Sequence, residues 1–199
     1  MDGLPLIALG ITAFAATNID DSLLLLLFFG DGRYRIRHIF AGQALGMGLL
    51  VLISLLGASL ALAVPDSWAG LLGLLPVAIG LRALVDHRRG REGESSTLQT
   101  AVSGDRPGWQ RTAAVAGVTL ANGGDNIGVY TPLFAVRTPG QTAVLLIVFA
   151  GALAVWLFAA LYLARRSVLA GRVQRIGRAV FPYALIGLGI AILFEAFVL

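Results

Sequence analysis

Acidic and amide residues lie in the middle of two hydrophobic segments of this 199-residue chain. Residues 17–21 read Thr-Asn-Ile-Asp-Asp and residues 122–126 read Asn-Gly-Gly-Asp-Asn, each within an apolar run long enough to cross a membrane. An ionised carboxylate at that depth costs about 2.5–3.5 kcal/mol, so three of them cost roughly 8–10 kcal/mol without compensation. A bound cation, a proton or water must offset their charge, and each of these is typical of a transport protein.

The rest of the chain has the composition of a helical membrane protein. Hydrophobic residues make up 57% of it and charged residues 13%, whereas a soluble domain carries about 25% charged residues. Apolar windows of about 19 residues predict six transmembrane helices, at residues 4–29, 39–64, 67–85, 112–136, 141–164 and 179–198. We therefore expect an all-α membrane protein whose first and fourth spans, which contain the polar motifs, are interrupted or tilted.

All 15 basic residues are arginines, and their distribution predicts the orientation of the chain. Only Arg137 lies on one side of the predicted spans. The other side holds Arg33, Arg35, Arg37, Arg82, Arg88, Arg89, Arg91, Arg106, Arg111, Arg165, Arg166, Arg172, Arg175 and Arg178. Because positive residues are retained in the cytoplasm, we expect both termini to lie outside. Arginines that border apolar spans face lipid headgroups and do not form a nucleic-acid surface.

Two halves with three spans each must insert in opposite orientations. We predict a first three-helix repeat at residues 1–86, a flexible cytoplasmic linker at residues 87–110 and a second, inverted repeat at residues 111–199. Both polar motifs contain Asn-x-x-Asp, and the third and sixth spans share a proline followed by glycine and leucine. Transporters with inverted repeats bind their substrate near the bilayer midplane, where interrupted helices from the two repeats meet.

Helix geometry selects the side chains expected at that meeting point. Residues three apart share a helix face, so Asn18 projects with Asp21, and Asn122 projects with Asp125. Asp20 joins this set only if the backbone unwinds, and the two glycines of the second motif permit such unwinding there. The two asparagines could instead be hydrogen-bonding contacts between helices.

Three further polar residues of the apolar spans are candidates for the same cavity. Thr17 and Asn126 adjoin the motifs, and Gln43 lies in the second predicted span. Gln43 could line the cavity or bond a neighbouring carbonyl. In the same span, Gly42-x-x-x-Gly46 could be a homodimer contact or allow close packing inside one protomer.

The candidate residues offer carboxylate and amide oxygens only. Cysteine is absent, and His38 and His87 fall at cytoplasmic span ends, where we expect them to be solvated. Oxygen ligands suit Mn²⁺, Ca²⁺, Mg²⁺ or Cd²⁺, and this chemistry does not rank the four ions by affinity. Neighbouring carboxylates also favour sharing a proton, so the hypothesis includes exchange of protons for metal. We expect no resident cofactor.

The two acidic motifs resemble those of the cadmium-resistance transporter family (CadD-like), which is similar to the LysE-type exporters. The resemblance rests on residues 15–21 (AATNIDD), followed by a leucine run, and on residues 121–132 (ANGGDNIGVYTP), with weaker matches in the second and third spans. It implies a six-span protein of the bacterial plasma (inner) membrane that exports Cd²⁺ and related divalent cations, driven by proton entry. The implied metal site comprises Asn18, Asp20, Asp21, Asn122, Asp125 and Asn126.

Four other functions compete with metal export. An exporter of cationic amino acids would use the aspartates to bind an ammonium group, but it would also need a partner for the substrate carboxylate. An intramembrane aspartic protease would pair two aspartates, yet the second motif lacks the Gly-x-Gly-Asp pattern of such enzymes. A channel or a metal sensor would bind cations without proton counterflow. Selectivity among Cd²⁺, Mn²⁺, Zn²⁺ and Ca²⁺ is not determined by the sequence.

Overall fold

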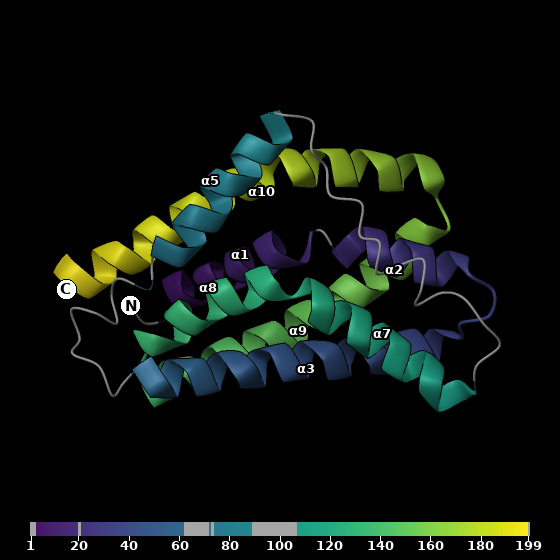
Figure 1. Ribbon diagram of the computed structural model, residues 1–199, viewed down its shortest axis with the longest axis horizontal. Coiled ribbons are helices and arrows are strands. Elements are labelled where there is room, and N and C mark those ends of the chain that lie inside the picture. Colours follow the sequence, from purple (N-terminus) through teal and green to yellow (C-terminus); the bar gives the residue numbers. More distant parts are fainter. Residues whose placement is uncertain (1–2, 20, 62–71, 73, 89–106, 199) are drawn as a thin grey trace.

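The computed structural model describes residues 3–19, 21–61, 72, 74–88 and 107–198. Within these residues the regular structure is entirely helical, which confirms the predicted all-α class. The helices, arranged as in Figure 1, are α1 (Leu4–Asn18), α2 (Asp21–Gly30), α3 (Ile36–Ala61), α5 (Leu74–Arg88), α7 (Gly108–Asn122), α8 (Gly124–Ala135), α9 (Pro139–Ala164) and α10 (Ser167–Val198).

The second and fifth predicted spans each form one long helix, α3 and α9. Of the described helices, these two are long and apolar enough to cross a membrane by length and composition. Both expose large apolar side chains, such as Leu56, Ile147 and Phe158, as a lipid-facing surface requires. α9 begins with a capping box, in which Gln141 N donates to Thr138 Oγ1 at 3.3 Å and Thr138 N donates to Gln141 Oε1 at 3.1 Å.

The first and fourth predicted spans are each divided into two helices at their polar motif. α1 ends at Asn18 and α2 begins at Asp21, whereas α7 and α8 meet at Gly123. A Cβ atom on Gly123 would collide with the side chain of Leu50, so glycine allows α3 to approach this break closely. The two spans thus have the interrupted form that their polar motifs predicted.

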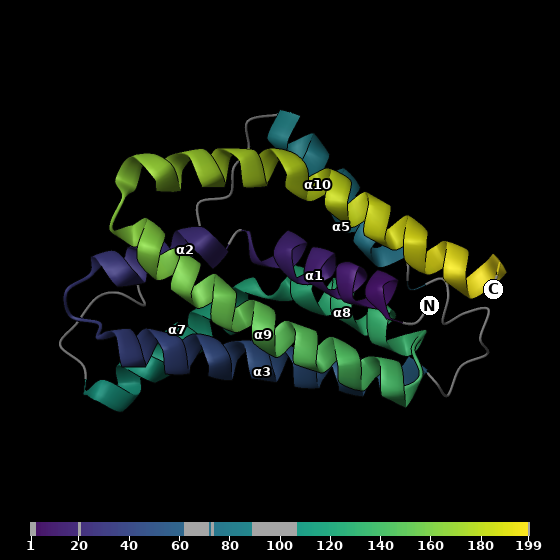
Figure 2. The ribbon, with the colours of Figure 1, turned by 180° about the vertical axis from the view of Figure 1, so that it is seen from behind.

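The last helix is longer than the sixth predicted span. α10 begins at Ser167, so residues 167–178, which we expected to connect two spans, are helical. Figure 2 shows that α10 is bent, and Pro182 inside the helix explains the bend because proline removes one backbone hydrogen bond. The first part of the third predicted span and most of the predicted linker at residues 87–110 lie outside the described residues.

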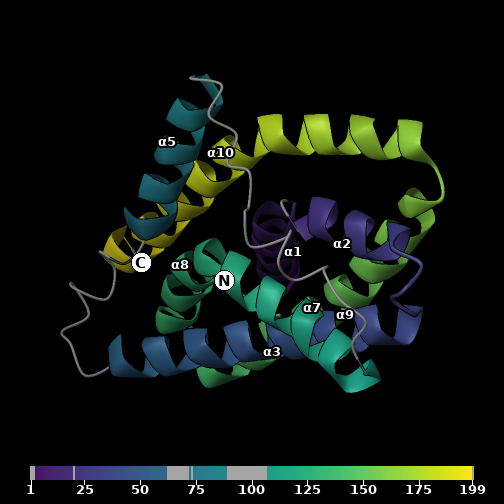
Figure 3. The ribbon, with the colours of Figure 1, turned by 45° about the vertical axis from the view of Figure 1, so that its right-hand side comes forward.

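Helices from the two halves of the chain pack against each other. α3 lies along α7 and α8, α9 lies along α1 and α2, and α5 pairs with α10 (Figure 3). Gly42 and Gly46 bring α3 close to α7. A Cβ on Gly42 would lie 2.5 Å from Val115 Cβ, and one on Gly46 would lie 2.7 Å from Thr119 Cβ. The Gly-x-x-x-Gly spacing therefore serves packing inside the protomer.

His38 is buried, so the expectation that this histidine is solvated was wrong. Its exposed fraction is 7%, and the ring lies against Gly108, the first residue of α7. The side chain of His87, for which the same expectation was made, lies outside the described part of the structure. The packing of α7 over the start of α3 buries His38, and the local sequence carries no sign of that contact.

Candidate functional site

Hydrogen bonds join the two polar motifs at the breaks between α1 and α2 and between α7 and α8. Asn122 Nδ2 donates to Asp21 Oδ1 at 2.8 Å, across a sequence separation of 101 residues. Asn18 Nδ2 donates to Asn126 Oδ1 at 3.5 Å. Four of the residues predicted to form the site therefore meet, and each bond runs from one motif to the other.

Asp21 is the most enclosed carboxylate of the described residues, with an exposed fraction of 1%. Its Oδ1 accepts from Asn122, and its Oδ2 accepts from Gln43 Nε2 at 3.2 Å. Thr119 Oγ1 donates in turn to Gln43 Oε1 at 2.6 Å, which fixes the amide with its nitrogen toward Asp21. These neutral donors stabilise an ionised carboxylate but do not cancel its charge.

Asn18 is fully buried and leaves one acceptor atom open. Its Nδ2 faces Phe14 O at 2.9 Å, Tyr130 Oη at 3.1 Å and Thr17 Oγ1 at 3.2 Å, besides Asn126. A flipped amide would set its oxygen against the carbonyl oxygen of Phe14, which only accepts, so this contact favours the orientation described. Asn18 Oδ1 has no hydrogen-bond partner. A buried amide oxygen of this kind costs free energy unless a donor or a cation satisfies it.

Asp125 lies in the first turn of α8 and is partly exposed. Its Oδ1 accepts from Asn126 N at 2.9 Å and from Asn126 Nδ2 at 3.4 Å. Hydrogen bonds of the Asn126 side chain thus link Asp125 to Asn18. The hydroxyl of Tyr130 lies within electrostatic reach of both Asp21 and Asp125. The remaining predicted acid, Asp20, is outside the described residues.

Thr119 and Tyr130 are two buried residues that hold the site together and that we did not predict from the sequence. Tyr130 Oη lies 2.8 Å from Thr17 Oγ1, and its ring packs on Phe149 with the ring centres 4.6 Å apart. Both residues could have been found, because Thr119 lies three residues before Asn122 and Tyr130 lies four residues after Asn126. Each therefore shares a helix face with a motif residue. Gln43, for which the sequence left two roles open, contacts Asp21 and Thr119.

The available ligand atoms are hard oxygens. Within the described residues, no group of three or more His, Cys, Asp or Glu side chains lies together. A cation held here would therefore need amide oxygens as well as carboxylates, and Asn18 Oδ1 is such an atom. Carboxylate and amide oxygens form the donor set that calcium-sized divalent cations prefer.

Broken helices that meet at buried polar groups, in a chain whose described residues form helices with apolar outer faces, define a membrane transport protein. The family model described as cadmium resistance transporter matches residues 14–199, so the chain belongs to the cadmium resistance transporter family. This match confirms the resemblance that the two acidic motifs suggested, and the family is one of transporters, not of enzymes. Comparisons with curated proteins and with solved structures gave no match.

Proposed function

We propose that this protein exports a divalent metal cation, with Cd²⁺ as the first candidate, from the bacterial cytoplasm across the inner membrane. The observation that carries the proposal is the buried carboxylate of Asp21, which lies at the break in the first span and accepts amide hydrogen bonds from Asn122 of the second motif and from Gln43. The metal would lie between the two breaks. Its proposed ligands are Asn18, Asp20, Asp21, Asn122, Asp125 and Asn126, with Thr17 and Gln43 beside them.

The oxygen atoms at the breaks support a cation site. The two oxygens of Asp21 accept amide hydrogen bonds from Asn122 and Gln43, and a carboxylate oxygen with two lone pairs can bind a metal beside such a bond. Asn18 Oδ1 adds a buried acceptor without a donor. A divalent cation would offset the carboxylate charge and satisfy this amide oxygen at the same time, which water alone would do only in part.

The helix contacts support two inverted repeats. The second helix of each proposed repeat packs along the broken span of the other, since α3 contacts α7 and α8 while α9 contacts α1 and α2. The motif contacts are not equivalent. The counterpart of the Asn122–Asp21 bond would join Asn18 to Asp125, whereas Asn18 reaches the neighbouring Asn126. Such asymmetry suits a carrier whose two half-sites open alternately to the two sides of the membrane.

Proton exchange completes the proposed cycle. When the metal leaves, the carboxylates lose the charge that it brought to bilayer depth, and protons can replace that charge. Protons that enter from outside and bind as the metal departs would drive export. A higher outside proton concentration should therefore speed the exit of metal from the cytoplasm.

Reconstituted vesicles test the proposal directly. Uptake of Cd²⁺, Mn²⁺, Zn²⁺, Ca²⁺ and lysine would be measured in turn, with the pH inside the vesicles recorded. We expect Cd²⁺ movement with proton counterflow. Lysine transport without metal transport would support an amino-acid exporter instead, and metal flux that is indifferent to the pH gradient would remove proton antiport.

A further inference from the structure

Arg82 lies within α5, nine residues into a helix that packs against α8. From its place in the sequence, we expected Arg82 among the arginines that flank the membrane. The contact between the two helices is close at Gly128 of α8, where an added Cβ would lie 2.5 Å from Ile79 Cδ1 of α5. Ile79 and Gly128 therefore fix the register of α5 on α8.

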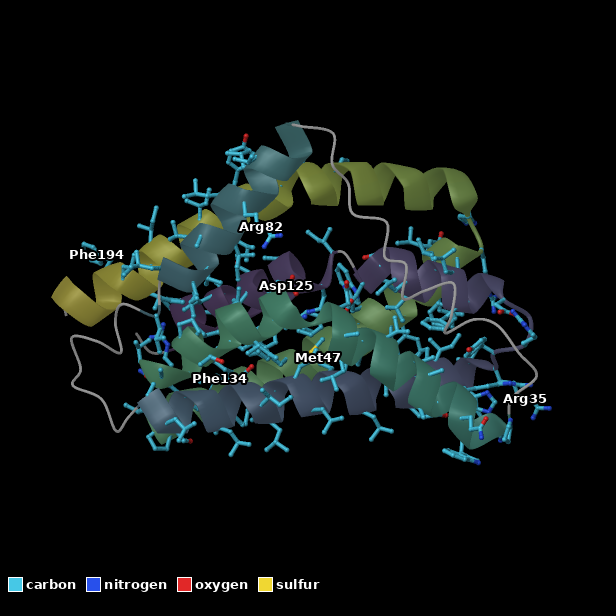
Figure 4. All side chains as sticks on the ribbon, viewed as in Figure 1. Arg35, Met47, Arg82, Asp125, Phe134 and Phe194 are labelled. Atoms are coloured by element: carbon cyan, nitrogen blue, oxygen red, sulfur yellow. The ribbon has the colours of Figure 1, made fainter. Side chains whose placement is uncertain are left out.

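This register brings Arg82 to the level of Asp125. Figures 1 and 3 show that α5 and α8 run in opposite directions. One turn after Ile79 on α5 is Arg82, and one turn before Gly128 on α8 is Asp125, so the two residues share the faces that meet. Figure 4 shows the Arg82 side chain directed from α5 toward Asp125.

We propose that Arg82 is a resident counter-ion of the carboxylate site, which faces Asp125 when no metal is bound and is displaced by an arriving divalent cation. This inference rests on the proposed function and adds a determinant of its specificity. A guanidinium stays charged at any physiological pH, and near bilayer depth it offsets a carboxylate that would otherwise be costly. A divalent cation carries twice the positive charge of the guanidinium and can therefore displace it from the carboxylates. A monovalent cation carries the same charge as the guanidinium and has no such advantage. Arg82 would therefore favour divalent over monovalent cargo.

The test compares Cd²⁺ binding to the whole protein in lipid nanodiscs, by calorimetry at one fixed pH. Arg82→Gln removes the competing charge and is expected to tighten Cd²⁺ binding about tenfold, because close charge pairs couple by at least that amount. Arg82→Lys should bind Cd²⁺ nearly as the unaltered protein does. Arg35→Gln is the matched control, since it removes the same charge from the end of the molecule away from Asp125 (Figure 4) and should change nothing.

The charge at position 82 can also be varied after the protein has folded. Because the chain has no cysteine, a cysteine introduced there is the only site for thiol reagents. Arg82→Cys would be capped by methanethiosulfonate reagents with either a neutral methyl or a positively charged aminoethyl group. The methyl-capped protein should bind Cd²⁺ about tenfold more tightly than the aminoethyl-capped protein. This comparison remains decisive if Arg82→Gln fails to fold.

Two results would overturn the inference while leaving metal transport intact. One is Cd²⁺ binding that weakens or stays the same when the charge at position 82 is removed. The other is an Arg82→Gln effect of equal size in an Asp125→Asn background, since that would assign the effect to another partner. Weaker lysine transport in Arg82→Gln, in a protein that does not bind Cd²⁺, would instead mark Arg82 as an anchor for a substrate carboxylate and contradict the proposed function itself.

Discussion

The side-chain amide of Asn122 donates a 2.8 Å hydrogen bond to the carboxylate of Asp21, and so connects the break in the first span to the break in the fourth. Asp21 opens α2, and Asn122 closes α7. Neither residue would make this contact if its span were an unbroken helix packed through apolar side chains. The bond therefore requires both helix breaks, and the candidate site depends on them.

Asp21→Asn should abolish metal transport and leave a folded protein. The substitution keeps the shape of the side chain and one of its two acceptor oxygens but removes the charge that a divalent cation requires, so we expect Cd²⁺ affinity to fall at least about 100-fold. Calorimetry in nanodiscs and vesicle uptake would measure this. Asp31→Asn, which removes an acid at the end of α2, serves as the control. Undiminished transport in Asp21→Asn would exclude Asp21 as a ligand.

Thr119→Val should weaken Cd²⁺ binding although Thr119 is not among the proposed ligands. The hydroxyl donates to Gln43 Oε1 and so presents the Gln43 amide nitrogen to Asp21. Loss of one buried hydrogen bond of this kind costs about 1 kcal/mol, or roughly a fivefold loss in affinity. Thr119→Ser retains the hydroxyl and should bind Cd²⁺ as the unaltered protein does. Equal losses in both variants would mean that binding responds to any change in the packing of this side chain, and would exclude the hydrogen bond as the cause.

Gly123→Ala should destabilise the fold, because the added methyl group would collide with Leu50 of α3. Overpacking of this kind costs about 1–3 kcal/mol, measurable as a lower midpoint of thermal unfolding in detergent. A Cβ on the neighbouring Gly124 would meet nothing within 4 Å, so Gly124→Ala is the matched control and should be neutral. Leu50→Ala should restore part of the stability of Gly123→Ala. Equal stability of the two glycine variants would contradict the close approach of α3.

The ion pair of Asp31 and Arg33, between α2 and α3, should make a small pH-dependent contribution to stability. Hydrogen bonds from Arg33, including one of 2.8 Å from Nη2, hold the pKa of the Asp31 carboxyl below its ordinary value of 3.8. The pair therefore stabilises the folded protein fully above that value, and the contribution is lost as the pH falls through the lower folded-state pKa. Arg33 is about half exposed, so we expect less than about 1 kcal/mol.

The difference in thermal midpoint between Asp31→Asn and the unaltered protein measures this contribution. The difference should be present at pH 7 and shrink in strong acid. A difference that grows as the pH falls would have the wrong sign for a carboxyl with a lowered pKa.

The sequence predicted the helical class and the interrupted first and fourth spans. Charge and hydrogen-bonding capacity at bilayer depth are properties of single segments, and a long apolar run with an aspartate in its middle has few ways to fold. The same motifs identified the family. The sequence did not reveal that α10 begins at Ser167, because residues 167–178 are too polar to register as a membrane span.

Within the site, the sequence by itself determined which polar side chains had to be sheltered from lipid: Asn18, Asp21, Asn122 and their neighbours. Only the tertiary structure decided that Asn122 reaches Asp21, that Thr119 orients Gln43, that His38 is buried and that Arg82 turns toward Asp125. Helical spacing relates residues on one segment, whereas these contacts depend on the register and separation of two helices. Small residues such as Gly46 and Gly128 set that register through packing at a distance in the sequence, and spacing along a single segment does not encode it.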